Sequence, residues 1–188
     1  MNNKHIIFWG LLILFPVVVL GQSNKDSLKL SPKSGMIIGG LCYQVISPNQ
    51  TSVFMMVGGL DKIKAYFKLQ SNFGVDDPQL ECKDNGIING TERWFTKNTE
   101  RVRLSITVGK LFPLSDNMTI FAGGGYGSRM FIWHTLDNKS VKNTDHSVVG
   151  LAAEGGAIFK LDKVYVLGGI TSVNFFYMET FFGLGMMF

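Results

Sequence analysis

A histidine and a serine, His134 and Ser147, are the two side chains of this sequence that could together hydrolyse an ester or amide. Such catalysis needs the imidazole within hydrogen-bond reach of the hydroxyl, and a third, acidic group that orients the imidazole. The pattern described below places both residues on the outer wall of the fold at neighbouring strand ends, with no outward acid beside them. The sequence therefore predicts no catalytic residue and a protein that is not an enzyme.

The two cysteines, Cys42 and Cys82, are the other reactive side chains. An oxidising compartment would permit a disulfide, but a bridge needs Cα atoms within about 7 Å of each other. The sequence leaves their pairing open. Two cysteines without nearby histidines do not make a zinc site, so we expect neither a metal nor a cofactor.

Charged side chains recur at alternate positions of otherwise apolar segments. In residues 62–73 (KIKAYFKLQSNF) one parity is apolar and the other polar, and residues 101–108 and 147–160 repeat the pattern. This alternation is typical of a strand with one apolar and one polar face. The polar faces of these and two further segments carry six charged residues: Lys64, Lys68, Arg103, Arg129, Glu154 and Glu179.

Eight such segments can be counted along the chain. Strands of about ten residues that alternate in polarity and are separated by turns are the signature of a transmembrane β-barrel. We therefore expect an all-β fold, an eight-stranded antiparallel up-and-down transmembrane barrel over residues 35–188. The second and seventh segments are apolar on both faces, so their orientation stays open. The expected strands are 36–46, 52–60, 63–73, 100–112, 117–134, 147–160, 163–172 and 179–188.

The N-terminus has the features of an export signal. Lys4 precedes a run of apolar residues, 6–20, which is typical of a signal peptide and short for a spanning helix. We expect a signal peptide over residues 1–21 and a periplasmic segment over 22–34. The formal charge of +4 is not clustered, and an exported protein would not meet nucleic acid, so no nucleic-acid partner is expected.

The connections between strands differ in length in a regular way. Those at 61–62, 113–116 and 161–162 are short, whereas those at 74–99 and 135–146 are longer. Barrels of the Gram-negative outer membrane have short periplasmic turns and longer external loops. We therefore expect both termini in the periplasm and the long loops outside.

The longest connection, 74–99, is the best candidate for binding an unknown external ligand, because function concentrates in long loops. The equally weighted alternative is that this connection is a mobile tip that binds no ligand. The candidate binding residues in this loop are Asp76, Asp77, Glu81, Asp84 and Trp94.

The interior of an eight-stranded barrel is just wide enough for side chains. Buried charges must be paired, so we expect Glu154 and Glu179 to form a network with Arg129, Arg103 and Lys68. This predicts a polar plug, with a narrow pore as the alternative. Aromatic residues near strand ends, among them Trp133 and Tyr177, are expected at the membrane interfaces.

Three stretches, 109–133, 150–170 and 174–188, resemble the small OmpA/OmpX-like outer-membrane barrels, notably in the run Ala122–Arg129. The final strand also resembles the C-terminal signal read by the barrel-assembly machinery. The resemblance implies a fold, a location and contact with outer-membrane lipid and lipopolysaccharide, and it transfers no catalytic residue. We expect a surface-binding, adhesive or envelope-structural protein, with a lipid A-modifying enzyme or a narrow pore as alternatives. The residues of the assembly signal are Phe182, Leu184, Met186 and Phe188.

Overall fold

The structure of the protein is a computed structural model, which describes residues 35–43, 51–60, 64–74, 78–92 and 94–187. The expected signal peptide and the segment 22–34 lie outside the described residues. No helix in the described part of the chain has the length and apolar character needed to span a membrane.

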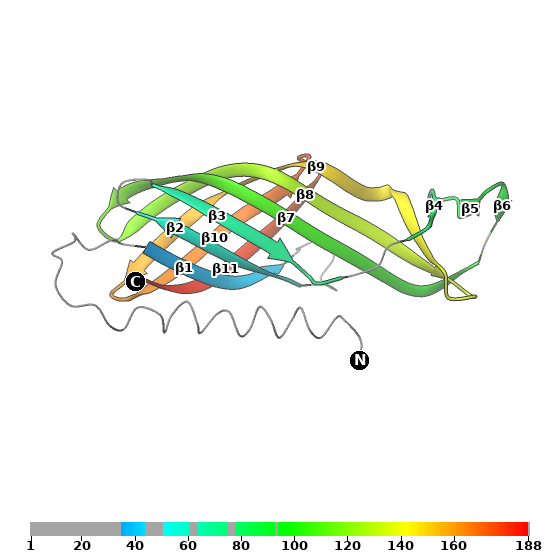
Figure 1. The fold of residues 1–188 in the computed structure, drawn as a ribbon, viewed down its shortest axis with the longest axis horizontal. Coiled ribbons are helices and arrows are strands. Elements are labelled where there is room, and N and C mark those ends of the chain that lie inside the picture. The colour runs from blue at the N-terminus through cyan, green and yellow to red at the C-terminus, as the bar shows by residue number, and fades with distance from the viewer. Residues whose placement is uncertain (1–34, 44–50, 61–63, 75–77, 93, 188) are drawn as a thin grey trace, which may run out of the picture. The chain divides into compact units, whose positions relative to one another are not determined.

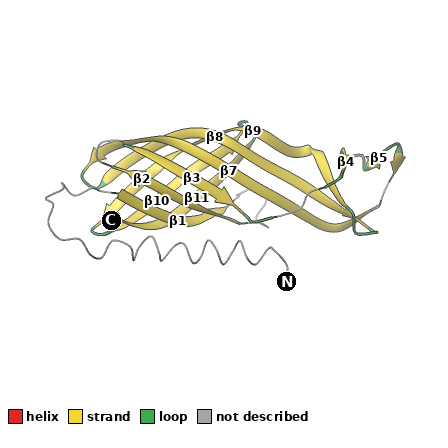
Figure 2. Cartoon of the chain, viewed as in Figure 1, coloured by secondary structure: helices red, strands yellow, loops and turns green. Residues whose placement is uncertain are grey.

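Eight strands form a closed antiparallel barrel (Figures 1 and 2). Each pairs with the strands next to it in chain order, and β11 returns to pair with β1, so that Gly40 lies opposite Gly183. Closure leaves no sheet edge along the barrel wall, which a sheet in lipid requires. The predicted fold class is confirmed. The barrel strands are β1 (Gly35–Tyr43), β2 (Ser52–Gly59), β3 (Ala65–Ser71), β7 (Phe95–Ser115), β8 (Met118–Thr135), β9 (Ser140–Leu161), β10 (Val164–Val173) and β11 (Tyr177–Met187).

Three short strands lie within the connection between β3 and β7. They are β4 (Leu80–Cys82), β5 (Ile87–Ile88) and β6 (Thr91–Glu92). β4 pairs in parallel with the start of β9, and β5 and β6 form a two-stranded hairpin.

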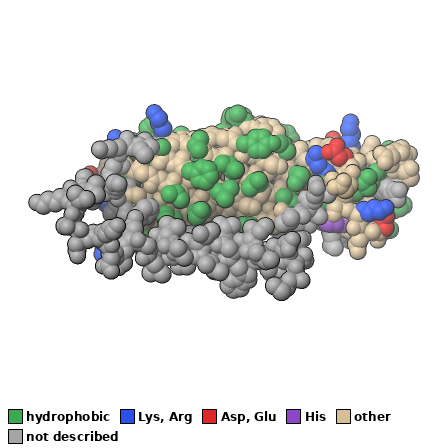
Figure 3. Space-filling view, in the orientation of Figure 1, with side chains coloured by type: hydrophobic (Ala, Val, Ile, Leu, Met, Phe, Trp, Pro, Cys, Tyr) green, Lys and Arg blue, Asp and Glu red, His purple; other side chains and the backbone are tan. Residues whose placement is uncertain are grey.

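The outer wall of the barrel is a belt of exposed apolar side chains, part of which is visible as green patches along the barrel in Figure 3. The alternation of exposure resolves the two strands whose orientation was open: Val53 and Val57 of β2, and Val164 and Ile170 of β10, face outward. A continuous apolar outer surface is what a barrel needs to lie in lipid.

The interior has two parts. At the end near the short turns it is filled by aromatic rings rather than by the polar plug that was expected throughout. Phe54 and Phe181 meet edge to face with ring centroids 5.2 Å apart, and Tyr66 and Phe121 meet in the same way at 5.5 Å. Glycines make room for these rings: a Cβ atom on Gly183 would lie 2.7 Å from the Phe54 ring.

Two barrel strands are longer than predicted. β7 begins at Phe95 and β9 at Ser140, so the connection expected at 135–146 shrinks to residues 136–139. β3 ends at Ser71 opposite Leu104, and β10 ends at Val173 opposite Ala152. The outer parts of β7, β8 and β9 therefore continue past the barrel rim as a three-stranded sheet (Figure 1).

Candidate functional site: a platform beyond the barrel rim

The sheet extension and the connection packed on it form what we call the platform, which comprises the described residues 78–92, 94–95 and 130–147. It has a small apolar core of its own, in which the rings of Phe95 and Trp133 lie 4.7 Å apart. Trp133 was expected at the membrane interface; instead it packs under the connection, because β8 continues past the rim. The platform core consists of Leu80, Cys82, Ile88, Phe95, Trp133 and Val141.

A large β-bulge in β9 lies at the base of the platform. Arg129 pairs with Val148 and Phe131 pairs with Asn143, so one residue of β8 faces the four residues 144–147 of β9. A bulge releases backbone groups from the ladder, and buried backbone groups must find other partners.

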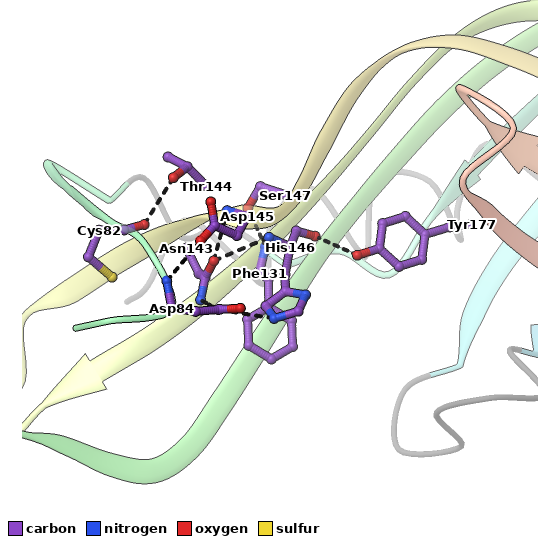
Figure 4. Close-up of polar contacts among 9 residues, drawn as sticks. All are labelled: Cys82, Asp84, Phe131, Asn143, Thr144, Asp145, His146, Ser147 and Tyr177. Atoms are coloured by element: carbon purple, nitrogen blue, oxygen red, sulfur yellow. Dashed lines mark hydrogen bonds and ion pairs between the residues drawn. The ribbon is translucent and has the colours of Figure 1, made fainter. Parts of the chain in front are cut away.

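Side chains supply those partners (Figure 4). The buried Asn143 accepts hydrogen bonds at Oδ1 from the amides of Asp145 (2.9 Å) and His146 (3.2 Å). The Ser147 hydroxyl accepts one from the amide of Phe131 at 2.9 Å. Each of these hydrogen bonds to a side chain replaces a backbone hydrogen bond that the strand pairing loses at the bulge. The bulge is therefore a stabilised part of the fold.

The Tyr177 hydroxyl, at the start of β11, donates to the carbonyl oxygen of His146 at 3.2 Å. The bulge is thereby tied to the barrel wall as well as to its own strand.

The same bulge holds the long connection in place. Asn143 Nδ2 donates to Asp84 Oδ1 at 2.7 Å, and the amide of Asp84 donates to Asp145 Oδ2 at 3.0 Å. His146 Nε2 lies 3.0 Å from the same Asp84 oxygen, an ion pair when the imidazole is protonated. Two further contacts join the connection to β9: Thr144 Oγ1 to the Cys82 carbonyl at 3.1 Å, and Lys142 to Glu81 at 2.7 Å. Within the bulge itself, the Phe131 ring of β8 lies 5.5 Å from the His146 ring, measured between centroids.

This docking assigns the predicted loop residues to two roles. Glu81 and Asp84 hold the connection on β9, whereas Trp94 exposes 78% of its surface. Asp76 and Asp77 lie outside the described residues. Within the described chain, no cluster of histidine, cysteine or acidic side chains could hold a metal ion.

Trp94 belongs to an exposed apolar tip. Phe95 pairs with Thr135, so Trp94 and Leu136 are the next residues on the two strands, and both are exposed. Ile87 of the separate β5–β6 hairpin is also exposed. We call Trp94 and Leu136 the tip patch.

The barrel interior near the rim holds the charged residues predicted from the alternation. Lys68 Nζ lies 2.5 Å from Glu154 Oε2, and Arg103 Nη1 lies 2.9 Å from Glu179 Oε1. Gln70 donates to Glu179 at 2.9 Å and thereby extends the second pair. The interior of the described barrel is thus occupied by paired charges and rings.

Lys64 does not lie where it was expected, whereas Arg129 lies inside the barrel beside a neighbour that was not predicted. Lys64 does not face the interior: it precedes β3, is exposed, and has a φ of 46°, because the turn before β3 takes the place of the predicted strand start. Arg129 lies directly opposite Arg103, with its guanidinium 3.9 Å from the centroid of the Tyr177 ring. Tyr177 therefore faces the barrel mouth rather than the membrane interface.

The two cysteines are both buried and both free. Cys42 lies in the barrel core and Cys82 in the platform core. Burial, together with the nearby carboxylates of Asp84 and Asp145, raises the pKa of the Cys82 thiol. This lowers the fraction of reactive thiolate.

The histidine and serine considered for hydrolysis are not neighbours. His134 lies opposite Ser140, whereas Ser147 lies in the bulge opposite Met130, about 13 Å further along the strands at about 3.4 Å per residue. The expected position at neighbouring strand ends is wrong, because β9 extends beyond Ser147 and carries a bulge.

The side chains of the proposed assembly signal lie on the outer wall where the strand is described. Phe182, Leu184 and Met186 are all exposed, and Phe188 lies outside the described residues.

Asn143 is the structural residue that the sequence pattern missed. It precedes Thr144 and Asp145 in a polar run that interrupts the alternation of β9. Asparagine and aspartate side chains commonly bond to backbone groups two residues on, and this was the available signal.

Comparison with known proteins gives the fold. No family model and no curated protein matches the sequence. The crystal structure of Ail, the attachment invasion locus protein of Yersinia pestis, superposes with a TM-score of 0.57 at 12% identity, covering 84% of this chain and 100% of that chain. Ail in complex with the heparin analogue sucrose octasulfate gives 0.55 at 11% identity with the same coverage. The protein thus has the fold of small eight-stranded outer-membrane barrels.

Proposed function

We propose that this protein is a non-enzymatic barrel of the Gram-negative outer membrane that displays the platform outside the cell and binds an external partner through the tip patch. The apolar outer wall supports the membrane position, since such a surface in water would aggregate. The two-residue turns 116–117 and 162–163 lie at one end of the barrel and the long connection between β3 and β7 lies at the other, which supports periplasmic termini and an external long loop.

One observation carries the binding proposal: the long connection is docked on β9 by side-chain contacts and still presents Trp94 almost fully exposed at its end. A fixed platform costs less conformational entropy on binding than a mobile loop. Exposed tryptophan is among the residues that contribute most to protein interfaces.

Adhesion of intact cells tests the proposal. Gram-negative cells that express the protein are compared with cells that do not, on cultured animal cells and on immobilised matrix proteins. A double variant, Trp94→Ala with Leu136→Ser, should abolish the added adhesion. Leu114→Ser is the matched control, because Leu114 is also exposed but lies at the short-turn end.

Sulfated polysaccharide belongs among the probes, because Ail shares the fold and was solved with a heparin analogue. The proposal fails if expression adds no adhesion, or if the tip-patch variant and the Leu114 control reduce it equally while surface levels are the same.

A further inference from the structure

Two arginines lie side by side on the barrel wall near its mouth. Arg103 of β7 and Arg129 of β8 are register partners, and only 3% and 5% of their surfaces are exposed. Like charges directly opposite each other on neighbouring strands are destabilising. Glu179, 2.9 Å from Arg103, supplies one negative charge to this pair.

The buried charges of the described barrel do not balance. Lys68, Arg103 and Arg129 are the buried basic residues, and Glu154 and Glu179 the buried acidic ones. Lys68 and Glu154 pair with each other deeper in the barrel, so the excess positive charge lies at the mouth.

One hydroxyl group faces the same space. Thr171 of β10 lies opposite the inward Glu154 and Glu179 and exposes only 5% of its surface. Its hydroxyl has no hydrogen-bond partner among the described residues. A buried hydroxyl without a partner costs free energy, so this group is available to a ligand that can accept a hydrogen bond.

These groups surround one small cavity that opens at the rim, with a volume of about 20 Å³. This is room for about one water molecule, so the cavity can enclose one oxygen of a ligand group whose other atoms lie in its opening at the rim. The residues that line it include Arg103, Arg129, Thr171, Tyr177 and Glu179.

We propose that the mouth cavity and its opening are a binding site for a single oxyanion group, a phosphate or sulfate, held by the two arginines and by the Thr171 hydroxyl. Arginine matches the oxygens of such groups through paired N–H donors, and the hydroxyl adds a neutral donor. The group can come from free inorganic anion or from a phosphorylated sugar of a surface glycolipid. This site does not depend on the tip patch or on its partner.

The test is a titration of the full barrel, refolded in a non-ionic detergent, with sodium phosphate against sodium chloride at equal ionic strength. Nuclear magnetic resonance follows the Thr171 and Ser172 amides and the arginine Nε–H groups. Phosphate should cause saturable shifts of these signals, and chloride should not. Arg129→Gln should weaken binding by about tenfold or more, the effect of losing a charge-assisted hydrogen bond.

Two further variants separate the site from general charge effects. Lys163→Gln removes an exposed positive charge at the short-turn end and should leave phosphate affinity unchanged. The hydroxyl variant, Thr171→Val, keeps both arginines and should still weaken binding, which guards against misfolding of Arg129→Gln. Folding of each is checked by the shift of the unboiled band on a denaturing gel.

Glucosamine 1-phosphate distinguishes the two sources. Tighter binding than inorganic phosphate assigns the site to a glycolipid headgroup, and equal or weaker binding assigns it to the free anion. The proposal is overturned if neither probe causes saturable shifts, or if the hydroxyl variant and Arg129→Gln bind as the unaltered protein does.

Discussion

Lys68 Nζ lies 2.5 Å from Glu154 Oε2 in the middle of the barrel, and neither side chain exposes any surface. The ammonium group also lies 3.7 Å from the centroid of the Phe181 ring, and Glu154 accepts a second hydrogen bond from Thr107 at 2.6 Å. The pair therefore joins the aromatic half of the interior to the polar half at the mouth.

Removing one partner of this pair should be more costly than removing both. Lys68→Met leaves the Glu154 carboxylate buried without its cation, a change that typically costs about 3–5 kcal/mol. Adding Glu154→Leu should recover most of that loss. Unfolding in urea, followed by tryptophan fluorescence in lipid vesicles, gives the free energies of unfolding.

Lys163→Met, an exposed lysine in the β9–β10 turn, is the control and should change stability little. Additive losses in the double variant would mean that Lys68 and Glu154 do not interact as the geometry indicates.

Asn143 should control the docking of the long connection. Asn143→Ala removes the acceptor of two bulge amides and the donor to Asp84, and we expect the connection to detach while the barrel stays folded. Cys82 reports this directly, because its thiol is buried in the platform core and its pKa is raised. Maleimide should modify Cys82 slowly in the unaltered protein and much faster in the variant.

Cys42, buried in the barrel core, is the internal control and should stay unmodified in both proteins. The rate at Cys82 should rise with pH in the unaltered protein, since only the thiolate reacts. Equal rates at Cys82 with and without Asn143 would contradict the docking role.

The barrel could be predicted from the sequence because its strands carry a strict alternation between an apolar outer wall and a narrow interior. Phe67, which faces outward, and Lys68, which faces inward, illustrate this. The platform could not be predicted, because the outer parts of β7 and β9 extend past the barrel and line no interior. The order of polar and apolar residues in these outer parts depends on local packing, such as that of Trp133 on Phe95, and on the bulge at 144–147.

Charge pairs inside the barrel were predictable only in part. Parity places Lys68, Arg103, Glu154 and Glu179 on the inner face, but the choice of partner depends on the register between strands distant in sequence. The same dependence explains Arg129, which the register sets opposite Arg103.

The turn between β8 and β9 should resist acid. A hydrogen bond from Thr135 and, after it, one from Lys139 lower the pKa of Asp137 to about 2. The unfolded value is about 3.9, so the ionised carboxylate stabilises the turn above that pH, and the contribution is lost as the pH falls through about 2. Carboxyl ¹³C shifts during an acid titration measure this pKa.

Thr135→Val should raise the pKa of Asp137 toward its ordinary value, and Lys139→Gln should raise it less. The reverse order would show that the lysine, 3.2 Å from the carboxylate, is the larger cause.

Gly150 and Asn174 should be coupled, because the side chain of one occupies the space left by the other. Asn174, in the β10–β11 turn, accepts a hydrogen bond at Oδ1 from the Leu151 amide at 2.8 Å and donates to the Val149 carbonyl at 3.2 Å. A Cβ atom on Gly150 would lie 2.3 Å from that Oδ1, and the φ of +155° is one that other residues rarely adopt.

Gly150→Ala should therefore destabilise the barrel by about 1–3 kcal/mol, the range for backbone strain. Asn174→Ala should cost about 1–2 kcal/mol for two lost hydrogen bonds. The double variant should cost clearly less than the sum, because alanine at 150 already displaces Asn174. Gly155→Ala, on the same strand with its nearest added contact at 3.5 Å, is the matched control and should be near neutral. If the losses of unfolding free energy measured in urea are additive, Gly150 and Asn174 are not coupled, and the contact between this turn and β9 does not depend on them.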